Sequence, residues 1–151
     1  MATQDEQDRK FLDAAYEEAQ KGLSEGGIPI GSVLVRNGEI IGRGHNRRVQ
    51  KGDPILHGEM DAIQNAGRQR TYRDVTCYTT LSPCMMCTGT ILQFKIQRVV
   101  VGDTTNSKGN EVLLRERGVE VIEVNDPSCI ALCKKFIEEK PDLWLEDWGG
   151  A

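Results

Sequence analysis

The sequence lacks the features that mark membrane-spanning, disulfide-rich or repetitive proteins. Its five cysteines are an odd number and do not suggest a disulfide framework. The charge-free segment that includes residues 81–94 is interrupted by serine, threonine and glycine, so it is too polar to span a bilayer. No internal repeat or low-complexity run is present. We therefore expect the 151 residues to form one globular domain, residues 1–151.

The chain also lacks an excess of basic residues, with 19 Lys and Arg against 23 Asp and Glu and a net charge of −4. A polynucleotide is therefore not the expected main partner, because such partners require a basic footprint. Seven basic residues still cluster in the sequence. They could form a solvated loop face or a patch that contacts phosphate. They are Arg43, Arg47, Arg48 and Lys51, and then Arg68, Arg70 and Arg73.

The first eight residues are acidic where a secretory signal would be basic and then apolar. No export signal is visible in them. We therefore expect a cytoplasmic protein, or a nuclear one if the source is eukaryotic, without membrane association.

The spacing of apolar residues predicts strands that alternate with helices. A tight Asn37-Gly38 turn joins the first two expected strands as a hairpin. The expected helices are 5–23, 57–66, 85–94, 110–116 and 126–139, and the expected strands are 30–35, 39–44, 75–81, 98–102 and 119–124. This order predicts a three-layer α/β domain, with parallel pairing in the strand-helix-strand units after the hairpin.

Two short motifs, His57-Gly58-Glu59 and Pro83-Cys84-Met85-Met86-Cys87, carry residues suited to metal chemistry. One imidazole and two thiolates suit Zn²⁺ with a fourth position open to water. Both motifs begin expected helices, whose positive ends favour thiolate, and the cysteine spacing of three puts both sulfurs on one helix face. Glu59 is not needed as a ligand and could shuttle protons while zinc-bound hydroxide attacks an amino-bearing ring carbon. The H-x-E…P-C-x-x-C pattern is typical of zinc-dependent nucleobase deaminases.

Other interpretations of the cysteine pair stay open at this point. A closed structural zinc site needs four protein ligands, and His45 could be the fourth. A redox pair would leave the upstream HxE motif unexplained. Cys129 and Cys133 lie four apart on an expected helix and are more simply buried core residues. A zinc-stabilised binding module without catalysis is the alternative to an enzyme.

The chain resembles the cytidine and deoxycytidylate deaminase superfamily over nearly its whole length, and within it the yeast-type cytosine deaminases. The segments that carry the resemblance are 15–19, 25–27, 29–31, 42–46, 50–52, 56–59, 78–84, 86–89, 144, 146–147 and 149. Gly58 fits the cytosine enzymes, because tRNA adenosine deaminases and bacterial guanine deaminases usually have alanine there. The resemblance implies a three-layer α/β/α fold with a central five-stranded mixed sheet, and a homodimer.

The resemblance also implies roles for individual residues. His57, Cys84 and Cys87 would hold one catalytic Zn²⁺ per chain, and Glu59 would be the proton shuttle. The implied substrate-binding residues are Asn46, Gly58, Ser82, Asp147 and Trp144. The side chain of Asn46 and the backbone of Gly58 would meet the carbonyl of a pyrimidine. The backbone of Ser82 and the side chain of Asp147 would meet its amino group or a ring nitrogen.

Trp144 would cover the base as part of a C-terminal lid made by residues 140–151. The activity implied is deamination of free cytosine to uracil and ammonia, in pyrimidine salvage. Three departures predict a reshaped pocket: the loop 103–109 has no aromatic residue, Trp148 replaces an aliphatic residue, and Val49 replaces a phenylalanine. Guanine, isocytosine, a nucleoside and a tRNA adenosine therefore stay open as alternative substrates.

Overall fold

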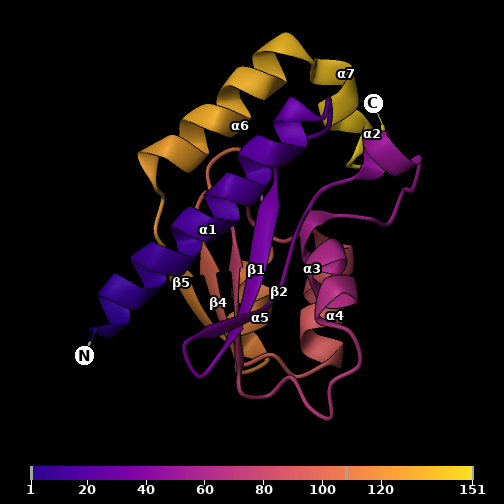
Figure 1. The fold of residues 1–151 in the computed structure, drawn as a ribbon. Helices are drawn as coiled ribbons and strands as arrows, with labels where there is room; N and C mark the ends of the chain where they lie inside the picture. The colour runs from indigo at the N-terminus through magenta and orange to yellow at the C-terminus, as the bar shows by residue number, and fades with distance from the viewer. Residues whose placement is uncertain (1, 108, 151) are drawn as a thin grey trace.

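The computed structural model describes residues 2–107 and 109–150, in which a five-stranded sheet lies between two layers of helices (Figure 1). Lys108 of the loop and Ala151 of the expected lid lie outside the described residues. The helices are α1 (Gln4–Ser24), α2 (Arg48–Lys51), α3 (Gly58–Ala66), α4 (Met85–Gln93), α5 (Glu111–Glu116), α6 (Pro127–Glu139) and α7 (Pro141–Glu146). The strands are β1 (Gly31–Arg36), β2 (Glu39–His45), β3 (Val75–Thr79), β4 (Arg98–Val101) and β5 (Glu120–Glu123).

The strand order is β2-β1-β3-β4-β5. Strand β1 pairs antiparallel with both β2 and β3, whereas β3, β4 and β5 run parallel. The predicted three-layer fold with a mixed five-stranded sheet is confirmed. The expected strand 75–81 ends earlier, at Thr79, because the chain leaves the sheet there to reach α4. The short helices α2 and α7 were not predicted.

The alternation of side chains along the central strands separates two cores. Leu34, Cys77 and Val99 lie on the sheet face that packs against α3, α4 and α5. Val33 and Tyr78 lie on the opposite face, against α1. A third cluster joins α6 and α7 to the segment before β1, and its members are Ile28, Ile30, Leu81, Cys133, Phe136 and Trp144.

Individual residues determine how closely α1 approaches β1 and where α6 begins. A Cβ atom on Gly31 would lie 2.1 Å from the carbonyl oxygen of Ala15, so only glycine lets α1 approach β1 this closely. Asp126 is the N-cap of α6, its side chain accepts from the backbone N–H of Cys129, and Pro127 occupies the first turn. Among the described residues, no helix is long and apolar enough to cross a membrane.

A polar cluster ties α1 to the sheet. The Asp8 carboxylate accepts from Arg98 Nη1 at 2.8 Å, from Arg98 Nη2 at 2.7 Å and from the Tyr78 hydroxyl at 2.7 Å. Burial favours a higher pKa for Asp8, but the hydrogen bonds from Arg98 and Tyr78 outweigh it and lower the pKa. The carboxylate therefore stabilises the folded state through these bonds.

Arg98→Met should lower the free energy of unfolding at pH 7 by about 2 kcal/mol, because it leaves the Asp8 carboxylate buried without its cation. The folded-state pKa of Asp8 lies below its unfolded value of about 3.9, so this contribution is complete above that value and is lost as the pH falls through the folded-state pKa. Urea unfolding at several pH values measures the difference between the two proteins. The matched control is Lys135→Met in an exposed pair, with little effect expected. A difference for Arg98→Met that does not shrink in acid would contradict this account.

Candidate metal centre and active site

The two sequence motifs meet because two helices begin side by side over the sheet. His57 is the N-cap of α3, and Cys84 is the N-cap of α4. The Cys84 sulfur accepts from the backbone N–H of Cys87, at 3.5 Å. Both helix N-termini therefore place partial positive charge at the cysteine sulfurs.

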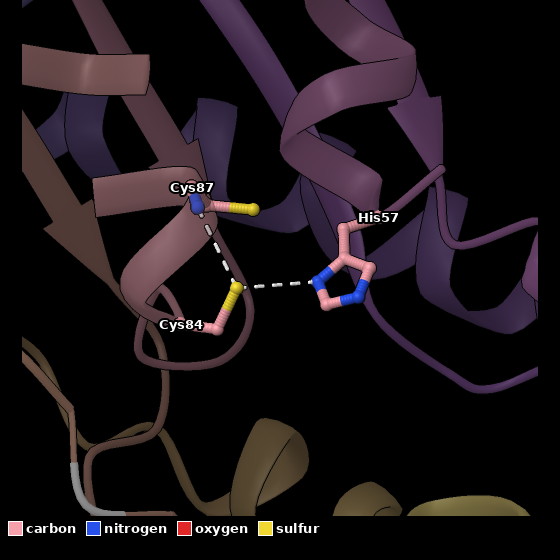
Figure 2. Close-up of side chains that lie close together, drawn as sticks. All are labelled: His57, Cys84 and Cys87. Carbon is pink, nitrogen blue, oxygen red and sulfur yellow. Dashed lines mark hydrogen bonds between the residues drawn. The ribbon is translucent and has the colours of Figure 1, made fainter. Parts of the chain in front are cut away.

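The three side chains converge on one point between α3 and α4 (Figure 2). Nδ1 of His57 lies 3.4 Å from Sγ of Cys84, and the possible ligand atoms of His57, Cys84 and Cys87 all lie within 4.8 Å of one another. In a tetrahedral zinc site with ordinary bond lengths, nitrogen and sulfur ligands are about 3.6 Å apart. The residues present therefore fit Zn²⁺.

His45 does not complete a four-ligand site. Its ring nitrogens lie 2.9 Å from a carboxylate oxygen of Glu18 and 2.8 Å from one of Glu25. Within the part of the chain that the structure describes, the cluster holds only His57, Cys84 and Cys87. Three protein ligands are the number typical of catalytic zinc, whereas structural zinc takes four.

The charges of the protein groups favour a thiolate at this point. The hydrogen bond from Cys87 and the contact with His57 lower the pKa of Cys84 to about 4, against the opposing effect of burial. The interaction of the Cys87 side chain with the Cys84 sulfur, and then burial, raise the pKa of Cys87. Burial favours a lower pKa for His57, but Cys84 and the charge of Asp147 outweigh it and raise the pKa to about 9. Cys84 is thus held as a thiolate, the form of cysteine that binds a metal ion.

Glu59 lies in the first turn of α3 and is only 4% exposed. Burial, and then the negative charge of Cys84, raise its pKa to about 7. A carboxyl group with a pKa near neutral pH can both accept and donate a proton, which suits a general acid and base.

Two residues predicted from distant parts of the chain meet beside His57. Nδ2 of the fully buried Asn46 donates to Oδ1 of Asp147 at 3.0 Å, and the same oxygen lies 3.2 Å from Nε2 of His57. The Asn46 side-chain oxygen accepts from the backbone N–H of Arg48. Oδ2 of Asp147 is buried and has no hydrogen-bond partner among the described residues. Burial raises the pKa of Asp147.

Ser82 and Gly58 also lie at the helix starts. The backbone N–H of Ser82 donates to the carbonyl of Asp103 at 2.9 Å, and its hydroxyl donates to the Glu111 carboxylate. The sequence analysis did not identify Glu111; an acidic residue at the start of an expected helix was its only signal. A Cβ atom on Gly58 would lie 3.1 Å from the carbonyl oxygen of Ile30, so alanine would fit tightly.

A cavity of about 460 Å³ opens beside the cluster. Its lining includes His57, Cys84 and Asp147, together with Trp148 from the C-terminal segment. Trp144 does not line this cavity: its ring packs 6.4 Å from Phe136 and 6.2 Å from Trp148, between centroids. The lining also includes Arg48 of the first basic cluster, and Pro54, Met86 and Glu146, which were not predicted as site residues.

The three arginines of the first basic cluster pair with carboxylates. Nε of Arg43 lies 2.8 Å from the Glu18 carboxylate, and Arg47 lies 3.2 Å from the buried carboxylate of Asp61. Arg48 lies 3.5 Å from Glu146. These three arginines therefore connect neighbouring segments around the site through ion pairs.

Replacing either cysteine of the cluster should remove the bound zinc. We expect Cys84→Ala and Cys87→Ala to bring the zinc content from about one ion per chain to near zero, because two ligands rarely retain the ion. Elemental analysis after dialysis measures this. Cys133→Ala is the matched control, since Cys133 is buried as Cys87 is but lies in the α6 core. Full zinc retention in both cluster variants would refute the assignment.

Comparisons with known proteins agree with this geometry. The family model of the cytidine and deoxycytidylate deaminase zinc-binding region matches residues 5–103. A cytosine deaminase of Candida albicans is 55% identical over 145 residues, which cover 94% of this chain and 97% of that protein. A tRNA-specific adenosine deaminase of Streptococcus pyogenes is 36% identical over 141 residues, or 88% of this chain and 89% of that protein.

A solved structure of NE0047 in complex with 2,6-diaminopurine shares the fold. Its TM-score is 0.76, with 17% identity over 86% of this chain and 81% of that chain. The predicted resemblance is confirmed. The chain belongs to the cytidine and deoxycytidylate deaminase family, and it is a zinc-dependent hydrolytic deaminase.

Proposed function

We propose that the protein deaminates free cytosine to uracil and ammonia. The observation that carries the proposal is the buried carboxyl group of Glu59 beside the three converging ligands His57, Cys84 and Cys87. The 55% identity to a cytosine deaminase over nearly the whole chain supports cytosine as the substrate. The cavity size and the Trp148 ring in its lining favour a small, flat base.

Bound zinc would lower the pKa of a water molecule and so supply a nucleophile at neutral pH. His57, Cys84 and Cys87 would hold the ion. The Glu59 carboxylate takes a proton from the attacking water and delivers one to the ring nitrogen next to the amino-bearing carbon. It then takes a second proton, from the hydroxyl group newly bonded to the ring carbon, and gives it to the amino group, which leaves as ammonia while the carbonyl forms. The pKa near 7 suits a group that must carry protons in both directions.

The base would be oriented by four residues that the family resemblance implies, of which Asp147 lines the cavity. Asn46 and the backbone N–H of Gly58, which begins α3, would meet the ring carbonyl. Oδ2 of Asp147 would accept from the amino group, since this buried oxygen has no protein partner among the described residues. The N–H of Ser82 is bonded to Asp103, so the Ser82 carbonyl would be its contribution.

The C-terminal segment would act as a lid over one domain made by residues 1–151. The described part of this segment, residues 140–150, includes α7, which packs on α6, and the cavity-lining residues Trp148 and Gly149. Trp148 would cover the base, because it lines the cavity, and Trp144 would support it from the core side. Trp148 would then replace the aromatic residue that the loop 103–109 lacks.

A tRNA adenosine is the second candidate substrate, favoured by the 36% identity to a tRNA-specific adenosine deaminase. Two observations weigh against it. The arginines nearest the cavity pair with carboxylates, as Arg47 does with Asp61, so they offer little free charge to a phosphate backbone. The residue between His57 and Glu59 is glycine in place of the alanine expected of those enzymes.

We also propose a cytoplasmic location and a homodimer. All five cysteines are unpaired, as expected in a reducing compartment. Exposed apolar side chains occur at the starts of the three helices on one sheet face: Ile55 before α3 is 52% exposed, Met85 in α4 is 62% and Val112 in α5 is 69%. Such a group of apolar residues suits burial against a second copy of the chain.

Glu59→Gln should reduce cytosine turnover by at least about 10³-fold while zinc remains at about one ion per chain. The amide cannot carry the proton, but it removes no metal ligand. Ammonia release and elemental analysis, on the same preparations, measure the two quantities. Glu138→Gln, in an exposed position of α6, is the matched control and should keep full activity.

Each outcome of this experiment separates the alternatives. If the Glu59→Gln variant functions as well as the wild-type protein, the protein is a zinc-stabilised binding module. No turnover of cytosine by the wild-type protein, with zinc bound, would exclude cytosine. Guanine, isocytosine, nucleosides and tRNA would then be assayed in turn.

Met85→Lys should shift the protein from dimer to monomer, because a charge would have to be buried in the apolar contact. Light scattering with size-exclusion chromatography measures the molar mass. The matched control is Val124→Lys, at an exposed apolar position beyond β5. A wild-type monomer at high protein concentration would refute the homodimer.

A further inference from the structure

A second cavity lies at the opposite ends of α3 and α4 from the metal cluster. Its volume is about 570 Å³, and the loop 67–73 and the last residues of α4 line it. In Figure 1 this loop forms the lower end of the molecule, whereas α2 and α7 lie at the upper end. Each helix has nine residues and is about 14 Å long, so the two cavities are separate.

The second cavity is cationic, although the protein is acidic. Arg68, Arg70, Arg73 and Lys95 line it, and no carboxylate does. An adjoining cavity of about 210 Å³ shares Arg73 and Lys95 and adds Arg117. In the part of the chain that the structure describes, none of these five side chains forms an ion pair with a carboxylate.

The cavity also offers aromatic surface. The Tyr72 ring is buried and held by its hydroxyl, which donates to the carbonyl of Gly67 at 2.8 Å. Phe94 packs on it, with the ring centroids 5.7 Å apart, yet remains 45% exposed. A buried, hydrogen-bonded tyrosine thus supports an accessible phenylalanine ring, with Ile63 beside it.

Lys95 adopts a conformation that glycine would adopt at lower cost. Its φ of 62° lies in the left-handed region, where side chains are disfavoured. The backbone N–H of Lys95 donates to the carbonyl of Leu92, so this conformation is built into the end of α4. A strained residue that places a cation at a cavity suggests a function for that cation.

We propose that this second cavity binds a nucleoside phosphate. The volume lies within the usual range of small-molecule sites. Arginine guanidinium groups donate hydrogen bonds to the oxygens of a phosphate. An exposed phenylalanine ring can stack on any of the bases. Arg70, Arg73 and Lys95 hold the phosphate, and Phe94 stacks on the base. Binding is independent of occupancy of the catalytic cavity.

Calorimetric titration of the zinc-loaded protein with uridine 5′-monophosphate tests the proposal. We expect saturable binding of one molecule per chain, at least about tenfold tighter than that of uridine or inorganic phosphate. Phe94→Ala, Arg70→Gln and Arg73→Gln should each weaken binding roughly tenfold, the effect of losing one charged hydrogen bond or one stacked base. Circular dichroism verifies that each variant is folded.

Two control variants fix the location of binding. Lys134→Gln removes an exposed cation of α6 far from the cavity, and Asn46→Ala alters the catalytic cavity. Both should leave the affinity unchanged. Binding lost in Asn46→Ala and retained in the Phe94 and arginine variants would overturn the proposal. Absence of saturable binding, affinity no better than for inorganic phosphate, or binding of RNA alone would overturn it as well.

Discussion

The structure depends on the meeting of two helix N-termini over one sheet. The starts of α3 and α4 bring His57 within 3.4 Å of Cys84, although 26 residues separate them in sequence. The backbone N–H groups at these two N-termini favour the thiolate form of cysteine. Packing on the sheet holds the two helices beside each other. The metal cluster, the carboxyl group of Glu59 and the cavity beside them all follow from this placement.

The environment of Glu59 illustrates how the fold tunes ordinary residues. An exposed glutamate would be ionised at neutral pH and would be a weak proton donor. Burial at the start of α3, beside the negative charge of Cys84, raises its pKa to about 7. The same desolvation raises the pKa of Asp147, whose contacts with Asn46 and His57 hold it against the cavity. Packing therefore adjusts the acid–base chemistry of this site.

The two basic clusters of the sequence have different surroundings, and only the fold distinguishes them. Arg43 and Arg47 fold against acidic side chains and stabilise the neighbourhood of the catalytic cavity. Arg68, Arg70 and Arg73 surround a cavity that has aromatic walls and no carboxylate. The arginines near the starts of α3 and α4 thus have a structural role, whereas those near the other ends of these helices are available to a ligand.

The sequence alone determined the five strands, the helices other than α2 and α7, and the types of residue at the metal centre. Local spacing predicted the hairpin at Asn37-Gly38, the helix over 126–139 and the three ligand types, because these depend on neighbours only a few residues away. The tertiary structure decided what depends on distant contacts. It placed Trp148 at the cavity and Trp144 in the core, and it brought Asp147 to Asn46 across 101 positions. No local pattern encodes such contacts, because they arise only when α7 packs against α6.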